Sequence, residues 1–152
     1  MVNQALLASG STEWATPFWL FDALNARFQF TLDPCATAEN ATCPRYFTRE
    51  QDGLKQPWAG ERIFMNPPYG SAIAAWVAKA RIEAHCGALV VGLLPARTDT
   101  KWWRTHVKAS ADVYFIAGRL KFGGAQNSAP FPSAIAVWTG LHFLYEPRGR
   151  HG

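Results

Sequence analysis

The sequence feature that most constrains the fold is the uninterrupted apolar run Ala88-Leu89-Val90-Val91-Gly92-Leu93-Leu94, which Pro95 ends. A strand of this composition has no polar face to present to water, so both of its faces must be covered. Helices packed on both sides of a parallel sheet provide such cover. The run is too short to cross a bilayer, which needs about 20 apolar residues. It therefore predicts an α/β fold and no membrane segment.

Strand and helix patterns alternate along the rest of the chain. Short apolar stretches predict further strands at 29–32, 62–65 and 113–116. Helices are predicted to begin at Thr16-Pro17, at Ser71 and near Thr100, the last running to Ala109. The apolar stripes that support the first two are Leu20, Phe21, Leu24 and Phe28, and then Ile73, Trp76, Val77, Ala80 and Ala84. In the first helix, Thr16 is expected to cap the free amides.

Turn-forming residues mark the segments between these elements. Residues 35–60 predict loops with one short helix, and the Gly-, Pro- and Ser-rich segment 121–132 predicts a mobile loop. Two apolar stretches, 135–138 and 141–145, flank Thr139-Gly140 and predict a hairpin. The 152 residues fit one domain, with 1–12 and 147–152 expected to be flexible. Together the patterns predict a three-layer α/β sandwich with a mostly parallel sheet and an antiparallel C-terminal hairpin.

The cysteine count and the net charge indicate the redox compartment and the kind of partner. The three cysteines, Cys35, Cys43 and Cys86, contain no C-x-x-C pair, so we expect neither a disulfide framework nor a metal site. Free thiols indicate a reducing cytoplasm, and the N-terminus lacks the basic start and apolar run of a secretory leader. The formal net charge of +4 suits an anionic partner such as nucleic acid, without requiring one.

One tetrapeptide carries a chemical prediction. Asn66-Pro67-Pro68-Tyr69 follows a predicted strand and precedes a predicted helix. The Asn66 side-chain oxygen and the Pro67 carbonyl are two acceptors, and the proline rings stiffen the turn that aims them. Two acceptors facing the N–H bonds of a planar amine, such as adenine N6, can hold the nitrogen nearer tetrahedral geometry and free its lone pair. Tyr69 is expected to stack on the extruded base, offsetting about 1–3 kcal/mol of the extrusion cost.

The alternative is that the tetrapeptide is a structural turn that only ends a strand. Its position between an apolar strand and a helix is a stricter match than the four letters alone, and favours the chemical interpretation.

The tetrapeptide resembles motif IV of the amino-methyltransferases. Further segments resemble, in the same order, the small phage-type Dam family of DNA N6-adenine methyltransferases, over residues 11–138. The segments are Glu13-Trp14-Ala15-Thr16-Pro17, Leu32-Asp33-Pro34-Cys35-Ala36, Asp52-Gly53-Leu54, Trp58, Leu94-Pro95-Ala96-Arg97-Thr98 and Gly118-Arg119-Leu120-Lys121-Phe122.

The resemblance implies a Rossmann-like methyltransferase fold, with S-adenosylmethionine as methyl donor and DNA as substrate. It implies that Thr16-Pro17 helps to hold the methionine carboxylate of the donor, with Trp14 as a pocket wall. The segment Asp33-Pro34-Cys35 takes the place of the first cofactor loop, so Asp33 is expected to accept from the donor's ammonium group. Asp52 is expected to contact the donor's adenine. A helix cap, a turn residue and a core tryptophan are the plain alternatives.

The sequence departs from the pattern of many methyltransferases in one respect. The Gly-rich G-x-G is missing after the first predicted strand, and the segment from Asp33 to Asp52 is too short for a full strand-helix-strand unit. The acidic partner of the donor's ribose therefore stays unassigned.

Basic residues suggest where DNA could lie. Arg97, Lys101, Arg104 and Lys108 are spaced by four, three and four residues, which predicts one basic face on a helix that begins near Pro95. Trp103 and Val107 would point toward the core. Arg119 and Lys121, before Gly123-Gly124, predict a loop that grips the substrate strand. A solvated helix face and an ordinary basic turn are the alternatives.

Three functions compete. The first is DNA adenine-N6 methylation by a phage- or prophage-encoded enzyme in the cytoplasm of a bacterial host. The second is methylation of a protein glutamine amide or another amine; cytosine N4 is disfavoured, because enzymes of that kind carry Ser where Asn66 stands. The third is a DNA-binding module without catalysis, which should not bind S-adenosylmethionine. The target sequence and the oligomeric state stay open.

Overall fold

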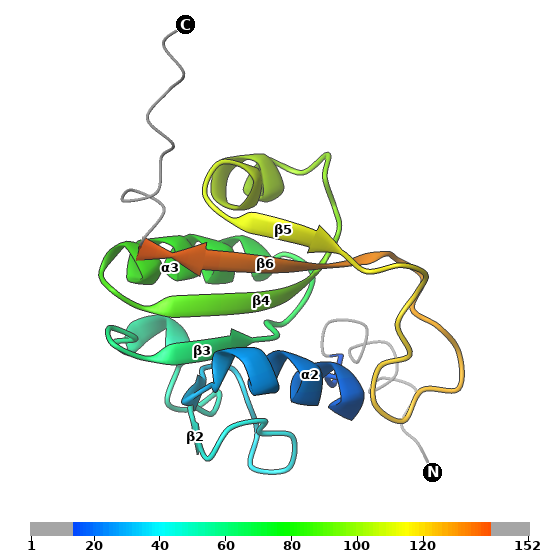
Figure 1. Ribbon diagram of the computed structural model, residues 1–152, viewed down its shortest axis with the longest axis horizontal. Helices are drawn as coiled ribbons and strands as arrows, with labels where there is room; N and C mark the ends of the chain where they lie inside the picture. Colours follow the sequence, from blue (N-terminus) through cyan, green and yellow to red (C-terminus); the bar gives the residue numbers. More distant parts are fainter. Residues whose placement is uncertain (1–13, 141–152) are drawn as a thin grey trace, which may run out of the picture.

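The computed structural model describes residues 14–140. One six-stranded sheet, with the strand order β2-β1-β3-β4-β6-β5, forms its centre (Figure 1). The strands are β1 (Leu32–Asp33), β2 (Arg45–Tyr46), β3 (Arg62–Met65), β4 (Leu89–Pro95), β5 (Asp112–Phe115) and β6 (Ser133–Thr139). Strands β2, β1, β3 and β4 pair in parallel, whereas β6 is antiparallel to both of its neighbours, β4 and β5.

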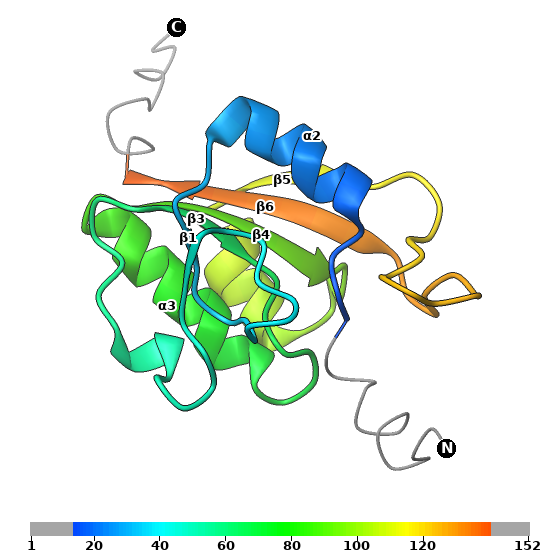
Figure 2. The ribbon, with the colours of Figure 1, turned by 90° about the horizontal axis from the view of Figure 1, so that it is seen from below.

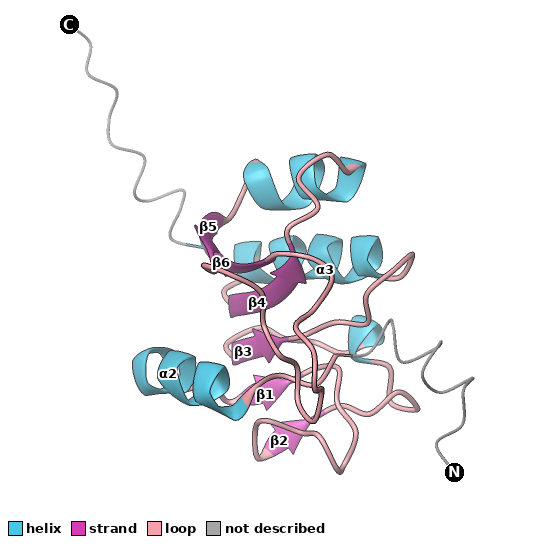
Figure 3. Ribbon diagram, turned by 90° about the vertical axis from the view of Figure 1, so that its right-hand side faces the viewer, coloured by secondary structure: helices cyan, strands magenta, loops and turns pink. Residues whose placement is uncertain are grey.

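Helices cover both faces of this sheet. They are α2 (Phe18–Phe28), the short 3₁₀-helix η2 (Gly53–Lys55), α3 (Ile73–His85) and the π-helix η3 (Trp103–Lys108). Figures 2 and 3 show α2 on one face and α3 on the other. The predicted fold class, a three-layer α/β protein with a mostly parallel sheet and antiparallel pairing on its C-terminal side, is confirmed.

Strand β4 explains why both faces need cover. Its residues Val90, Val91, Leu93 and Leu94 are fully buried, as the apolar run predicts. A Cβ on Gly92 would lie 3.0 Å from the ring of Trp138 on the neighbouring strand β6, so the tryptophan packs where a side chain is missing. Helix α3 buries the five residues of its predicted stripe, from Ile73 to Ala84.

The N-terminal prediction about Thr16 is wrong. Helix α2 has Pro17 at its N-cap position, with no side-chain hydrogen bond there, and the amides of Leu20 and Phe21 bond the Pro17 carbonyl. Proline has no N–H of its own and its fixed φ leads into a helix, so the helix begins without a hydroxyl cap. The Thr16 hydroxyl serves another residue, described below.

Other boundaries also differ from the predictions. The first strand is Leu32–Asp33 rather than 29–32, and residues 35–60 contain β2 besides the expected short helix. The segment after β4 winds as a π-helix, and Arg97 lies in the loop before it rather than on the helix. Strand β6 finds its antiparallel partners in β4 and β5. The other predicted hairpin strand, 141–145, lies outside the described residues, as do 1–12 and 147–152.

Segment 116–132 connects β5 to β6 without a regular element. It nonetheless buries Leu120, Phe122, Ala129 and Phe131. In Figure 1 it lies at the right-hand edge of the sheet, where β3 and β4 end and where the start of α2 also lies. Ligands of open α/β sheets bind at the carboxyl ends of the strands, so this edge is where a site is expected.

Two further observations concern the described part of the chain. Within residues 14–140, no helix has the length and apolar character that crossing a membrane requires. In the same range, no three His, Cys, Asp or Glu side chains are grouped as metal ligands would be.

Candidate active site

Asn66 directly follows β3, and its side-chain amide is held by the chain's first described residues. Its Nδ2 donates to the backbone carbonyl of Trp14 and, at 3.0 Å, to Oγ1 of Thr16. Its own backbone carbonyl accepts from the Cys35 thiol at 3.3 Å. Burial raises the pKa of Cys35 well above its ordinary value, so the group stays a protonated donor. Both ends of Asn66 are therefore fixed.

The remaining polar atom of Asn66 has no partner among residues 14–140. Its Oδ1 is buried and accepts no hydrogen bond from these residues. A buried acceptor without a donor costs about 1–3 kcal/mol, so folded proteins rarely retain one without a role. Because Nδ2 is held by two acceptors, Oδ1 is fixed in a direction where a ligand N–H could satisfy it.

Tyr69 stiffens the end of the Asn66–Tyr69 turn. Its hydroxyl donates to the Leu93 carbonyl at 3.1 Å, and its ring meets those of Phe131 and Phe122 at centroid distances of 5.6 and 6.3 Å. Burial raises the pKa of Tyr69, which keeps it a donor. Only 5% of the residue is exposed, so little of the ring is open to a base in this arrangement. Stacking of Tyr69 on an extruded base stays a prediction.

Segment 116–132 holds the N-terminal residues over the turn. The Trp14 ring lies 5.3 Å, centroid to centroid, from both Phe122 and Phe131, edge-on to each. The Gly123 amide donates to the Ala15 carbonyl at 2.8 Å. The partners of Asn66, at 14–16, are thus positioned by residues more than a hundred positions later in the chain.

Asp33, at the end of β1, is a buried carboxylate. It is 5% exposed and accepts from the Thr42 amide at 3.1 Å, the Thr42 hydroxyl at 2.8 Å and the Cys35 amide at 3.3 Å. Burial raises the pKa of Asp33, and these hydrogen bonds partly oppose the shift. No cation of residues 14–140 forms an ion pair with Asp33. Sequence reasoning missed Thr42, which belongs to no recognisable motif.

Gly53 brings the Asp52 loop against the Asp33 loop. A Cβ on Gly53 would lie 1.9 Å from the Pro34 carbonyl oxygen, a distance that only glycine permits. Asp52 has a positive φ of 53°, and its side chain accepts from the Leu54 amide at 3.1 Å. The two predicted cofactor loops are therefore neighbours, although eighteen positions separate Pro34 from Asp52.

The predicted residues divide into two groups. Trp14, Thr16, Cys35 and Asn66 are linked by hydrogen bonds, and Pro17 is buried at the start of α2. The predicted DNA-binding residues are all exposed: Arg97, Lys101, Arg104, Arg119 and Lys121. Arg97 also lies over the Phe131 ring, 5.8 Å from its centroid. Trp103 and Val107 are buried, as predicted.

The fold and the turn together define a class of protein. The chain has a Rossmann-like α/β sheet, and Asn-Pro-Pro-Tyr follows its central parallel strand β3. This is the arrangement that the resemblance to amino-methyltransferases implies. The chain belongs to the Dam family, described as DNA N-6-adenine-methyltransferase (Dam), whose family model matches residues 5–145.

Two curated relatives support the assignment. A protein of Haemophilus phage HP1 (strain HP1c1), named DNA N-6-adenine-methyltransferase, is 31% identical over 112 residues, which are 72% of this chain and 65% of that protein. A protein of Escherichia phage T1 with the same name is 29% identical over 109 residues, 70% of this chain and 45% of the relative. The chain thus spans less than two thirds of the length of either relative.

Proposed function

We propose that this chain is a DNA adenine-N6 methyltransferase that uses S-adenosylmethionine. The observation that carries the proposal is the buried Oδ1 of Asn66, which has no partner among residues 14–140, beside an amide nitrogen that is fully engaged. A ligand N–H is the group that would satisfy this oxygen, and the target amine of adenine offers two. Membership of the Dam family and the names of the phage relatives support DNA adenine as the source of that amine.

In the proposed mechanism, the chain's own residues prepare the amine. Asn66 Oδ1 accepts one N–H of the extruded adenine, and the Pro67 carbonyl accepts the other. With both N–H bonds directed at acceptors, the nitrogen becomes nearer tetrahedral. Its lone pair is then less delocalised into the adenine ring and can attack the methyl group. Pro67 and Pro68 resist movement of the turn, and the bond from Tyr69 to Leu93 ties the turn to β4. The methylated amine is acidic and loses its proton to water, so no dedicated base is needed.

The residues at the ends of β1 and β3 fit the methyl donor. Asp33 is a buried carboxylate without a cationic partner among residues 14–140, and the ammonium group of S-adenosylmethionine would supply the missing charge. We propose that Asp33, Pro34 and Cys35 hold its methionine part together with Trp14, Thr16 and Pro17. Asp52 would contact its adenine. The bound donor supplies an electrophilic methyl group.

The basic surface fits the DNA backbone. We propose that Arg97, Lys101, Arg104, Arg119 and Lys121 neutralise phosphates, since all five are exposed and carry positive charge. The three cysteines are free thiols, as is usual in a reducing compartment. Together with the phage relatives, this supports the proposal that the protein acts in the cytoplasm of a bacterial host.

The test is nucleoside mass spectrometry on adenine-unmethylated DNA incubated with the protein and S-adenosylmethionine. We expect N6-methyladenine with the wild type and none with Asn66→Ala, while S-adenosylmethionine binding, measured by calorimetry, persists in the variant. If the protein binds the cofactor but leaves no methylated base in single- or double-stranded DNA, the substrate would instead be a protein amide or another amine. Absence of cofactor binding would indicate a binding module.

A further inference from the structure

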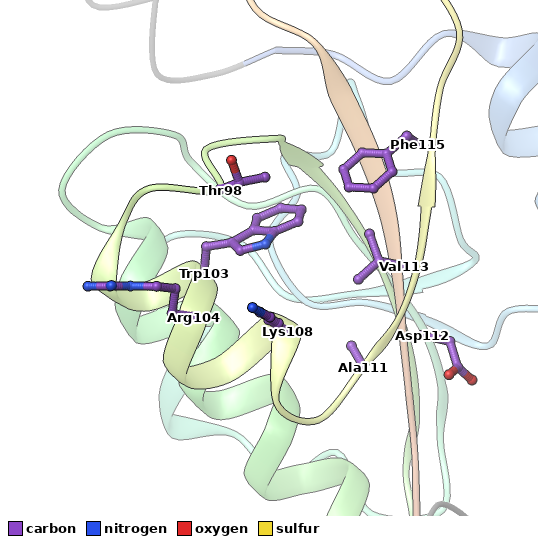
Figure 4. Close-up of a pocket in the computed structure, with 8 residues that line it drawn as sticks. All are labelled: Thr98, Trp103, Arg104, Lys108, Ala111, Asp112, Val113 and Phe115. Carbon is purple, nitrogen blue, oxygen red and sulfur yellow. The ribbon is translucent and has the colours of Figure 1, made fainter.

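A groove lies beside β5, the edge strand at the opposite side of the sheet from β2. The groove, of about 520 Å³, separates the π-helix η3 from β5 (Figure 4). Its lining includes Thr98, Trp103, Arg104, Lys108, Val113 and Phe115. None of the catalytic or cofactor residues proposed above belongs to it.

The groove combines positive charge with an exposed aromatic ring. Arg104 and Lys108 are exposed on successive turns of η3. Phe115 is 66% exposed, and its ring is nearly parallel to that of buried Trp103, with 6.3 Å between centroids and 21° between planes. The acidic lining residue, Asp112, turns its carboxylate to the other side of β5 (Figure 4). Phosphate beside a flat ring is the ligand chemistry that such a surface suits.

The π-helix is an independent indication. Such helices are rare, and single π turns occur frequently at functional sites. Here Val107 of the π segment Trp103–Lys108 is buried in the core, and Trp103, Arg104 and Lys108 line the groove. The Arg104 guanidinium extends to the side of η3 that faces away from Phe115 (Figure 4).

The groove also lies within reach of the catalytic turn. Phe115 is the last residue of β5, and Asn66 follows β3, three strand positions away in the same sheet. With neighbouring strands about 4.8 Å apart, the separation across the sheet is roughly 14 Å. At about 3.4 Å per stacked nucleotide, a strand some four nucleotides long covers it, and an extended strand needs fewer.

We propose that this groove binds one unpaired nucleotide of the DNA strand that carries the target adenine, a few positions from it. Arg104 and Lys108 take its phosphate, and its base stacks on Phe115. The inference rests on the proposed function, which already assigns Arg104 to a phosphate. It adds a base-stacking contact at Phe115 and a preference for opened or single-stranded DNA around the target.

The experiment measures binding of a fluorescein-labelled single-stranded oligonucleotide with one adenine, by anisotropy over a range of salt concentrations. The groove variants are Phe115→Ala and Arg104→Ala with Lys108→Ala. The matched controls are Tyr114→Ala, an adjacent residue that is 61% exposed and does not line the groove, and Arg27→Ala with Arg49→Ala, which removes two exposed charges elsewhere.

We expect Phe115→Ala to raise Kd by about tenfold, the effect of one lost base stack. The groove charge variant should lower the salt slope by about 0.7, as for one phosphate on a single strand. Both controls should bind as the wild type does.

Groove variants that match their controls would overturn the inference. So would a change in solution mass with Phe115→Ala at unaltered Kd, because the groove would then be a contact between copies of the chain. These outcomes are separate from the proposed function, which fails only if the wild type leaves no N6-methyladenine in either single-stranded or double-stranded DNA.

Discussion

At the scale of single residues, the site depends on the different hydrogen-bonding roles of the nitrogen and the oxygen of the Asn66 side-chain amide. Asn66 donates its two N–H bonds to the Trp14 carbonyl and the Thr16 hydroxyl, and its oxygen accepts no hydrogen bond from residues 14–140. An asparagine whose nitrogen were unheld could rotate and present either atom. Thr16 therefore acts, in this structure, as a positioning residue for Asn66.

Replacing Thr16 with Val tests this role. The change removes one hydrogen bond to Nδ2, and we expect kcat to fall about five- to tenfold, in line with ~1 kcal/mol for one bond. Thr16→Ser should restore the rate, because it restores the acceptor. A rise in KM for S-adenosylmethionine at unchanged kcat would instead assign Thr16 to the cofactor alone.

Sequence reasoning selected Asn66 as a candidate because its tetrapeptide lies between a strand and a helix, and its catalytic role stays a prediction. It misassigned the Thr16 hydroxyl, since the cap rule is local, whereas the partner of Thr16 is fifty positions away. Thr42 was missed for the same reason: nothing in the sequence near Thr42 shows that its amide and hydroxyl meet Asp33.

At the scale of elements, packing of one loop on another shapes the cofactor side. The Asp52 loop approaches the Asp33 loop as closely as it does because residue 53 has no side chain. The Trp58 indole reinforces this arrangement by donating to the Gly53 carbonyl at 2.9 Å. The close approach at Gly53 therefore sets the distance between the two loops.

Gly53→Ala should separate these loops. A methyl group 1.9 Å from the Pro34 oxygen cannot be accommodated without backbone movement, and we expect a loss of about 3 kcal/mol in the free energy of unfolding, at the upper end for overpacking. Urea denaturation measures it. Gly60→Ala is the control, because Gly60 has a positive φ of 78° but open space around it; its cost should stay near 1 kcal/mol. Equal losses in the two variants would argue against the clash.

The elements that were predicted well are α3, which has an apolar stripe along one face, and β3 and β4, which are short apolar runs. The π-helix was predicted as an ordinary helix, because buried Trp103 and Val107 fit either winding. The two-residue strands β1 and β2 leave hardly any periodicity to detect. The position of β6 between β4 and β5 depends on long-range pairing that no local pattern encodes.

At the scale of the whole molecule, one hydrophobic core runs from α2 through the sheet to α3 and η3. A ligand that binds only the folded state of such a domain stabilises all of it. The proposed cofactor site can therefore be tested through global unfolding.

S-adenosylmethionine at about one hundred times its Kd should raise the free energy of unfolding by about 2.7 kcal/mol. Asp33→Asn removes the proposed charge partner of the ammonium group; if affinity falls about tenfold, the same ligand concentration should stabilise that variant by about 1.4 kcal/mol less. Thermal or urea unfolding with and without ligand gives both values. Equal stabilisation of the two proteins would remove Asp33 from the site.

The place of β6 has a consequence for synthesis on the ribosome. The nascent chain presents β4 and β5 long before residues 133–139 emerge, and those residues must then enter between them. Until that happens β4 has an open edge, and the apolar run that dictates the fold is a surface on which chains can aggregate. Whether the nascent chain folds or aggregates thus depends on how soon β6 is synthesised. A ribosome that stalls before residue 133 leaves a product that cannot complete its sheet.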